Sequence, residues 1–558
     1  VPSFTSFLIR TVAWRIPLAP NGTFSKWLVG MGWISENGIQ ILETPMAVQI
    51  AIVYNYLGFM ILPLFVALDR IDVRMREASK DLGAGRIATF ISVTLPLAGP
   101  GIVAGVLLTF IPMCGDYVTA TVLGGAKGNM IGAMIASQFS GAQNWPLGSA
   151  MAILMIAAVL LVLIIGFVIT WLAPRVAMLA YPIIQIVRRS IYKRSVARKQ
   201  TVKQEFRTKF EVLPKVLSAW TVLVLVFLFI PILLVFLHSF NYGGSFTIWS
   251  GRSSTKWWGE LFNGGVMVAV LIRFAVVIFA ALIFVRINRR RESFSKRVLS
   301  LVMPLSFVFA VVLNGLITEW YRTIFDFAGI GDSIRNSFIA AFGATIIAVL
   351  IGGMSGVALA RRPGNWTKFF MATVFLILVT PEIMDAIALA TWFPRIKAIP
   401  IVGIIFTNGW GPFNGGINKL WVGQSLYASA VVTLIVRARL SGIDESLEEA
   451  AADLGAPPGR AFRQITLPLI ASAMVAGALL SFALCLDNAV ISTLISEAGS
   501  TTFPVALLGA TRSTIKPFWG VGAVLLFVVT LSALWFLAVI LRRGGDSASK
   551  IAATFTGS

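Results

Sequence analysis

The sequence is poor in the side chains that most often hold metal ions or form covalent cross-links. Its 558 residues include two cysteines, Cys114 and Cys485, and one histidine, His238. Two cysteines so far apart give neither a disulfide framework nor a metal-ligand spacing. We therefore predict no metal site, and we interpret His238, at the end of a hydrophobic run, as a structural residue.

Charged residues are also scarce. They make up 13% of the chain, against about 25% in a typical soluble domain, whereas 57% of the residues are hydrophobic. Runs of 18 or more nearly uncharged residues recur, and the most apolar are 149–173, 216–237, 336–359 and 518–541. Such runs are typical of membrane helices, and they lack the alternation of barrel strands. The sequence therefore predicts an all-α polytopic protein of the lipid bilayer.

The hydrophobic pattern predicts about eleven transmembrane helices, with boundaries uncertain by a few residues. The candidate spans are 48–68, 97–114, 149–173, 216–238, 265–285, 298–318, 336–359, 368–391, 419–438, 467–487 and 518–541.

The basic residues alternate between the loops. The formal net charge is +22, and eleven Lys and Arg residues lie in the 174–215 connection alone, whereas 115–148 contains only Lys127. Lys and Arg are retained on the cytoplasmic side during membrane insertion. We therefore predict that the basic loops, the 69–96 and 439–466 loops and the C-terminus are cytoplasmic, and that the charge reflects topology and not nucleic-acid binding.

The chain contains an internal repeat. Residues 77–96 read EASKDLGAGRIATFISVTLP and residues 449–468 read EAAADLGAPPGRAFRQITLP, with ten of the twenty positions identical. Chance would give about one or two identities. A slip of one residue further on also matches Cys114 and Asp116 with Cys485 and Asp487. Since both loops are predicted to be cytoplasmic, the sequence indicates two related halves in the same orientation.

Each repeated loop predicts a small helix–turn–helix. A polar helical run ends at a glycine, Gly83 or Gly455, and we expect a second short helix to stop at Leu95-Pro96 or Leu467-Pro468. Such a segment is too polar to enter the membrane. An ordinary amphipathic loop would be the alternative, but two copies on the same side favour a docking site for a two-fold or pseudo-two-fold partner.

The loop pattern resembles the coupling loop of ATP-binding cassette (ABC) importer permeases, which has Glu-Ala-Ala, then Gly, then Ile-x-Leu-Pro. The resemblance implies a type I ABC importer permease fold in which each loop docks on an ATP-hydrolysing subunit. The positions that match this coupling motif are Glu77, Ala78, Asp81, Gly83, Leu95 and Pro96 in the first copy, and Glu449, Ala450, Asp453, Gly455, Leu467 and Pro468 in the second.

Longer stretches narrow the resemblance to the two permease subunits of spermidine/putrescine importers. GDYVTATVLGGAKGNMIGAMIASQF from residue 115 resembles the first, whereas TPEIMDAIALA at 380–390 and CLDNAVIS at 485–492 resemble the second. The chain looks like a fusion of the two. We expect a first half over 1–181, a basic cytoplasmic linker over 182–215, a second half over 216–545 with two extra spans at about 265–318, and a cytoplasmic tail over 546–558.

The likeness begins part-way through the third span of the first permease, so the first half looks N-terminally incomplete. We expect either that the gene continues upstream of Val1 or that this copy is impaired.

The sequence contains no G-x-x-x-x-G-K-[ST] phosphate loop. We therefore expect a transporter subunit of the cytoplasmic (inner) membrane and not an enzyme, with no catalytic residues and no bound cofactor. The resemblance implies that ATP and magnesium are held by separate ABC ATPase subunits, as a dimer, and that a periplasmic or extracellular binding protein delivers the solute for alternating access.

Carboxylates in or beside membrane spans are candidates for a substrate path. Glu382 and Asp385 lie three residues apart in the predicted 368–391 span, and Asp116 and Asp487 follow spans that the repeat relates. Helix capping or pairing with loop arginines is the alternative role. Asp487-Asn488 departs from the Asp-Asp pair of many second permeases.

A polyamine is the favoured substrate, with ferric iron, thiamine or phosphonate as alternatives within the same family. An ion-coupled secondary carrier remains an alternative of another class, although a carrier has no use for two coupling loops. A channel is disfavoured because the sequence has no filter-like pore loop.

Overall fold

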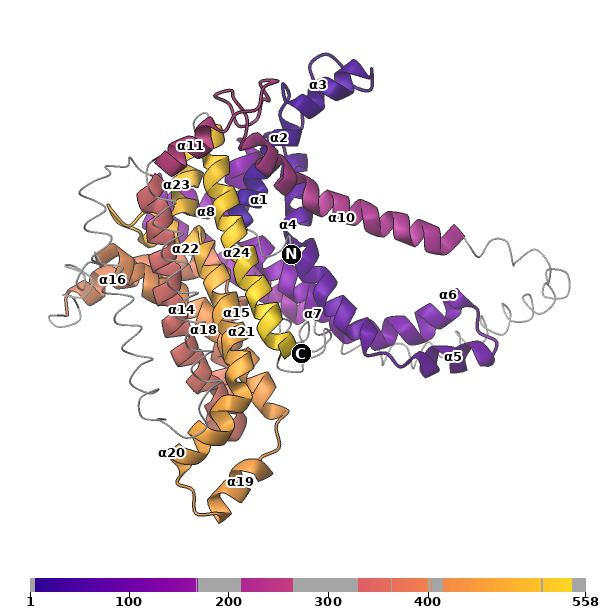
Figure 1. Cartoon of the computed structure of the whole chain (residues 1–558), viewed down its shortest axis with the longest axis vertical. Helices are drawn as coiled ribbons and strands as arrows, with labels where there is room; N and C mark the ends of the chain where they lie inside the picture. The colour runs from indigo at the N-terminus through magenta and orange to yellow at the C-terminus, as the bar shows by residue number, and fades with distance from the viewer. Residues whose placement is uncertain are drawn as a thin grey trace.

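The computed structural model describes residues 6–166, 168, 212–263, 330–362, 364–399, 403, 415–512 and 515–543. The named elements are all helices, and one isolated antiparallel bridge joins Asn241 to Ser253. The predicted all-α fold is therefore confirmed for this part of the chain. Figure 1 shows a helical bundle with α3 (Thr23–Gly30) and α11 (Lys256–Asn263) at one end and α19 (Ser446–Asp453) and α20 (Pro458–Ala461) at the other.

The membrane spans match the hydrophobic pattern. The described residues contain five continuous helices long and apolar enough to cross a bilayer, and three bent helix pairs that would each form one further span. The continuous helices are α4 (Pro45–Asp69), Trp145–Gly166, α10 (Val212–His238), α14 (Ile330–Arg361) and α18 (Gly415–Ser441). Together with the three bent pairs and α24 (Pro517–Arg543), these five helices account for nine of the eleven predicted spans.

Some predicted segments cannot be compared with the structure. The two extra spans at 265–285 and 298–318, most of the 182–215 linker and the 546–558 tail lie outside the described residues. The helix α10 begins at Val212, four residues before the predicted start of the second half.

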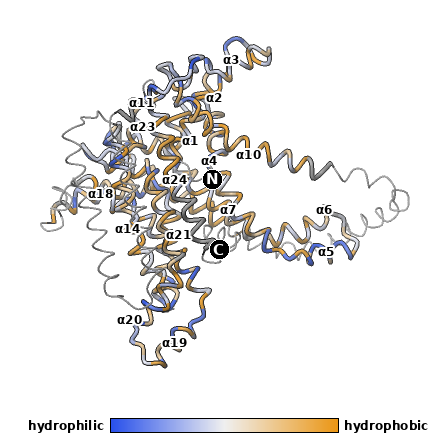
Figure 2. The backbone as a smooth tube through the Cα atoms, viewed as in Figure 1, coloured by the Kyte–Doolittle hydropathy of each residue, from blue (hydrophilic) through white to orange (hydrophobic). Residues whose placement is uncertain are grey.

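Burial distinguishes central helices from peripheral ones. In the most apolar window of α18, 61% of the residues are buried, whereas the corresponding value for α10 is 17%. Figure 2 shows that α10 is nevertheless hydrophobic along most of its described length, whereas α5 (Val73–Asp81) is hydrophilic. Since an apolar surface of this size is unfavourable in water, α10 lies where lipid would surround the bundle.

The prediction of one continuous span over 368–391 is wrong. Two helices occupy this region, α15 (Asn365–Val379) and α16 (Glu382–Lys397), and their axes differ by 102°. Thr380, between them, has an extended backbone with φ −66° and ψ 127°. The ring of the following Pro381 disfavours a helical conformation at Thr380, so the chain turns sharply at this dipeptide.

The expected helix stops at Leu95-Pro96 and Leu467-Pro468 are also wrong. A π-helical turn, η2 (Phe90–Thr94) in the first copy and η5 (Phe462–Thr466) in the second, runs directly into the span. In each copy the leucine N–H donates to the carbonyl five residues earlier, which is Phe90 or Phe462. Each π-helical turn continues the helix up to Pro96 or Pro468. A proline is tolerated there because it has no backbone N–H that needs a hydrogen-bond acceptor.

The sequence repeat corresponds to a structural repeat at a constant offset of 372 residues. The helix α5, the turn η2, α7 (Leu95–Cys114) and α8 (Ile131–Ser140) have counterparts in α19, η5, α21 (Leu467–Leu486) and α23 (Phe503–Ala510). The ends of α4 and α18, at Asp69 and Ser441, obey the same offset. Two halves with one backbone plan therefore follow each other along the chain.

Close packing of α14 on α18 depends on glycine. A Cβ atom at Gly343 would lie 2.2 Å from the Trp421 ring, and one at Gly352 would lie 2.6 Å from the Ser429 carbonyl oxygen. Gly356, four residues after Gly352, is similarly crowded by α18. Small residues at this spacing let two membrane helices approach closely.

The substitution Gly352→Val tests this packing. We expect it to lower the free energy of unfolding by about 1–3 kcal/mol, the usual effect of overpacking a tight interface. Thermal unfolding of the purified chain in detergent would measure the change. Gly353→Val is the matched control, because a Cβ atom at Gly353 meets only the flexible end of Met474. Equal unfolding temperatures for the two variants would contradict the close approach.

Candidate functional site

The two repeated loops adopt the same backbone. Gly83 and Gly455 both have positive φ, +83° and +75°, a conformation that favours glycine. An aspartate begins each loop: Asp72 accepts from the backbone N–H of Arg74 at 2.9 Å and Asp444 from that of Ser446 at 3.0 Å. Hydrogen bonds from the Ser446 backbone and side chain hold the pKa of Asp444 below its ordinary value.

The predicted docking residues lie on the surfaces of these loops. Exposed residues of the first helix are Glu77, Ala78 and Asp81 in the first copy and Glu449, Ala450 and Asp453 in the second. The glycines form the turn, and the Leu-Pro pairs 95–96 and 467–468 stand exposed at the starts of α7 and α21. The structure thus presents the matched positions of both copies to solvent, while their docking role remains a prediction.

One pair of loop residues was missed in the sequence. Leu82 and Leu454, at equivalent positions beside the turn glycines, are 87% and 89% exposed. Their matching exposure at equivalent positions makes both leucines candidates for the same kind of contact. The signal was present in the sequence, because both leucines belong to the identical Asp-Leu-Gly triplets.

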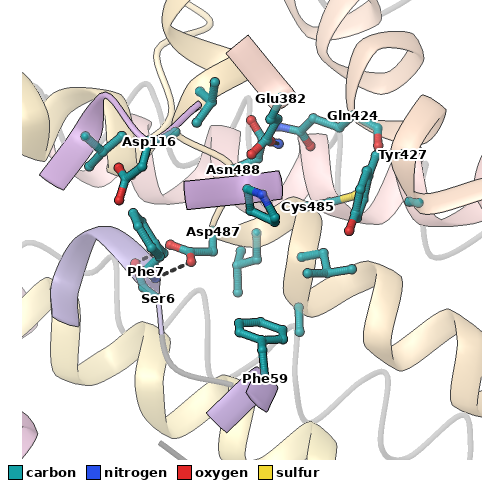
Figure 3. A pocket seen from close by; sticks show the side chains of 18 of the residues that line it. Ser6, Phe7, Phe59, Asp116, Glu382, Gln424, Tyr427, Cys485, Asp487 and Asn488 are labelled. Atoms are coloured by element: carbon teal, nitrogen blue, oxygen red, sulfur yellow. Dashed lines mark hydrogen bonds between the residues drawn. The ribbon is translucent and has the colours of Figure 1, made fainter. Parts of the chain in front are cut away.

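A cavity of about 250 Å³ lies between the two halves. Its wall contains three of the four carboxylates predicted for the substrate path, namely Asp116, Glu382 and Asp487 (Figure 3). Residues of α1 (Phe7–Ala13), α4 and α7 from the first half face residues of α18 and α21 from the second. The wall also contains four aromatic side chains, those of Phe7, Tyr56, Phe59 and Tyr427, and the guanidinium of Arg10.

Asp487 connects the two halves. Its carboxylate accepts hydrogen bonds from the Ser6 hydroxyl and from the backbone N–H of Phe7 at the start of α1 (Figure 3). A carboxylate at a helix N-terminus satisfies free N–H groups and opposes the helix dipole. The Arg10 guanidinium, one turn along α1, also interacts electrostatically with Asp487. The second half therefore caps a helix of the first.

The structure corrects the repeat at the ends of these spans. Asp116 accepts from the backbone N–H of Thr119 at 3.0 Å, and Asn488 accepts in the same way from Ile491 at 3.0 Å. Asp487 is the C-cap of α21, as Gly115 is of α7. The counterpart of Asp116 is therefore Asn488, at the offset of 372, and the one-residue slip that paired it with Asp487 is wrong.

Glu382 and Asp385 occupy different places although they share α16. Glu382 lines the cavity and accepts a hydrogen bond of 2.5 Å from the Asn488 amide. Asp385 is absent from the cavity wall, and its Oδ2 is buried without a hydrogen-bond partner in the described residues. Only Glu382 of this pair faces the space between the halves.

Arg10 was not recognised in the sequence as a site residue. It is 4% exposed, lies on the cavity wall and donates to the Asn55 carbonyl at 3.4 Å. A lone charge in the apolar stretch FTSFLIRTVAW was the available signal. Among the described residues, no group of three or more His, Cys, Asp or Glu side chains could hold a metal ion.

Comparison with known proteins finds one family that matches this chain in two places. The family described as "Binding-protein-dependent transport system inner membrane component" matches the chain twice, over residues 2–178 and 348–544. The two matches lie in the first and second structural halves.

Three relatives illustrate the similarity to known transport proteins. The spermidine/putrescine transport system permease protein PotB of Haemophilus influenzae is 44% identical over 153 residues, which are 27% of this chain and 53% of that protein. PotB of Escherichia coli is 40% identical over 153 residues, 27% of this chain and 55% of the relative. The putrescine transport system permease protein PotI of E. coli is 28% identical over 313 residues, 55% of this chain and 84% of the relative. The chain thus spans about half the length of the PotB relatives.

The capping role of Asp487 can be tested by stability. Asp487→Ala leaves the part-buried donors of Ser6 and Phe7 without this acceptor, and we expect it to lower the free energy of unfolding by about 1–3 kcal/mol. Thermal unfolding in detergent measures this, with Glu36→Ala as a control that removes an exposed carboxylate far from the cavity. An unfolding temperature equal to that of the control would argue against the contact between the halves.

Proposed function

This chain belongs to the family of binding-protein-dependent transport system inner membrane components, and we propose that its two halves together form the membrane path of an ABC importer for a polyamine. The chain carries both permease units that resemble PotB and PotI, so it is a fused permease. The path lies between the halves, where the cavity is found.

The driving force comes from a separate ABC ATPase, which holds ATP and magnesium. The exposed Leu82 and Leu454 each insert into a groove of one ATPase subunit, beside the acidic Glu77 and Glu449. Burying a leucine side chain that is nearly fully exposed contributes about 1.5–3 kcal/mol to such docking. Both loops then lie on the cytoplasmic side, as the distribution of basic residues predicts.

The observation that supports a polyamine is the composition of the cavity wall. Three carboxylates stand against one guanidinium, and aromatic faces lie beside them. Carboxylates and aromatic rings both stabilise an ammonium group that has lost water. A flexible polycation suits a narrow space with several such groups, and a solute-binding protein would deliver it to the side opposite the loops.

The contact of Asp487 with α1 suggests how these residues take part. In the arrangement that the structure describes, Ser6 and Phe7 occupy the carboxylate oxygens. When the halves separate during alternating access, the carboxylate loses these donors, and an ammonium group of the solute replaces them. Asn488 holds Glu382 in a comparable way on the other side of the cavity.

Other solutes of the same family, such as ferric iron, thiamine or a phosphonate, remain alternatives. An anionic phosphonate would meet three carboxylates and one cation, which is unfavourable. An ion-coupled carrier would not need the duplicated loops.

The docking role predicts that charged substitutions of the loop leucines stop transport. Leu454→Arg should reduce spermidine uptake by proteoliposomes containing the chain, its ATPase and its binding protein by more than about tenfold, because a buried unpaired charge costs several kcal/mol. Glu449→Lys should behave similarly, whereas membrane insertion should be unchanged. Trp33→Arg, three residues after α3 at the end of the bundle away from α19 (Figure 1), provides a control for an added charge on another exposed apolar side chain. Uptake by Leu454→Arg at the level of the unmodified chain would contradict docking through this side chain.

The cavity predicts a different result for two neighbouring acids. Glu382→Gln should lower spermidine uptake by about tenfold, which corresponds to about 1.4 kcal/mol of lost interaction. Asp385→Asn is matched, because it makes the same chemical change three residues along α16 but away from the cavity wall. Initial rates at several spermidine concentrations would measure both. Equal losses in the two variants would indicate a general effect on α16 and not a substrate path.

A further inference from the structure

The second repeated loop, which contains α19 and is the proposed second docking loop, is connected to the membrane-spanning helix α14 through one arginine. Arg361 is the last residue of α14, and its side chain is 12% exposed. Its Nε donates to Glu448 at 3.1 Å, and one Nη donates to Glu445 at 3.2 Å and to the Ile443 carbonyl at 3.3 Å. All three acceptors lie on α19 or on the chain leading into it. The end of α14 is therefore held against the docking helix.

The same carboxylate oxygen links a third element. Oε1 of Glu448 also accepts from the Thr466 hydroxyl at 2.8 Å, and Thr466 is buried at the end of η5, directly before α21. Glu448 thus joins the docking helix to both α14 and α21. The bond between Arg361 and Glu448 joins two ionised groups, and such hydrogen bonds are shorter and stronger than neutral ones.

The link continues to the cavity through close packing. Gly352 and Gly356 bring α14 against α18, whose residues Gln424 and Tyr427 line the cavity. A tightly packed helix pair moves as a unit, because its interface cannot deform gradually. A displacement of α19 would therefore reach the cavity wall through Arg361 and α14.

The first loop lacks this link in the described residues. At the offset of 372, Glu448 corresponds to Arg76 and Glu445 to Val73, so neither carboxylate is present. The first loop is instead closed by a hydrogen bond between the hydroxyls of Ser79 and Thr89, 3.2 Å apart. Two loops with the same backbone therefore differ in how they are attached to the spans.

We propose that Arg361 is a positioning residue that couples movement of the second docking loop to the α14–α18 pair, so that the two loops contribute unequally to transport. One Nη of Arg361 is buried with no hydrogen-bond partner in the described residues. Buried donors are rarely left without a partner. The unused nitrogen is consistent with a second arrangement, in which α19 has moved and this nitrogen of Arg361 donates to another acceptor.

The inference rests on the proposed function, and the test is made in the assembled complex. The chain, its ATPase and its binding protein are reconstituted in proteoliposomes, and ATP hydrolysis and uptake of radiolabelled spermidine are measured together. Arg361→Gln should lower uptake per ATP hydrolysed by about tenfold, within the usual range of coupling between sites. Assembly with the ATPase and hydrolysis without binding protein should change less than about twofold, since the docking surface itself is intact.

Two further variants separate coupling from loss of charge or of fold. Arg362→Gln is the matched control, because Arg362 is the adjacent basic residue and is exposed; its coupling should be that of the unmodified chain. The charge exchange Arg361→Glu with Glu448→Arg, made together with Glu445→Gln so that two carboxylates do not face each other, restores an ion pair, and we expect it to recover at least half of the uptake per ATP.

The outcomes are distinct. Full coupling in Arg361→Gln, equal losses in Arg361→Gln and Arg362→Gln, or no recovery in the charge exchange would each overturn the role of Arg361. If Arg361→Gln does not assemble, the charge exchange alone decides in the same way. Absence of ATP-dependent uptake with the unmodified chain would instead contradict the proposed function.

Discussion

The carboxylate of Asp487 is the contact on which the arrangement around the cavity depends. A half-buried carboxylate among apolar helices is stabilised when hydrogen-bond donors surround it. Asp487 obtains these donors from the other half, at the start of α1. The reciprocal position, Gly115, has no side chain and packs against Pro381 at the start of α16. α16 carries its own acid there, Glu382, which is held by Asn488. The start of α1 thus has an acidic group from the other half, Asp487, whereas the start of α16 has an acidic group of its own, Glu382.

This arrangement places acidic groups and aromatic faces around one space. Each of the three cavity carboxylates already has a protein donor. A cationic solute would have to compete with those donors. This competition would weaken the binding of a cation in the cavity.

The repeat shows how one backbone can carry two roles. The hydrogen bond of the first aspartate, the turn glycine and the π-helical segment agree between the copies to the residue: Asp72, Gly83 and η2 have counterparts in Asp444, Gly455 and η5. The side chains that face other elements differ, as Arg76 and Glu448 do. Backbone geometry is set locally by capping and glycine, whereas attachment to a neighbour depends on which neighbour is present. The fusion of two different permease units therefore keeps the docking shape while it changes how each loop is held.

The sequence by itself determined the class, the approximate spans, the repeat and the family, because hydrophobic runs, basic loops and a duplicated motif are local in the chain. It also supplied Asp116, Glu382 and Asp487 as candidates. It misjudged the helix ends at Pro96 and Pro381, since a proline can follow a π-helical turn or break a span, and its neighbours decide which. Only the tertiary structure decided that Asp385 lies off the cavity, that Arg10 lies on it, that Asn488 is the counterpart of Asp116, and that Arg361 meets Glu448. The contact of Arg10 with Asn55 joins residues 45 positions apart, and that of Arg361 with Glu448 joins residues 87 positions apart. At such separations, spacing along the chain says nothing about distance in space.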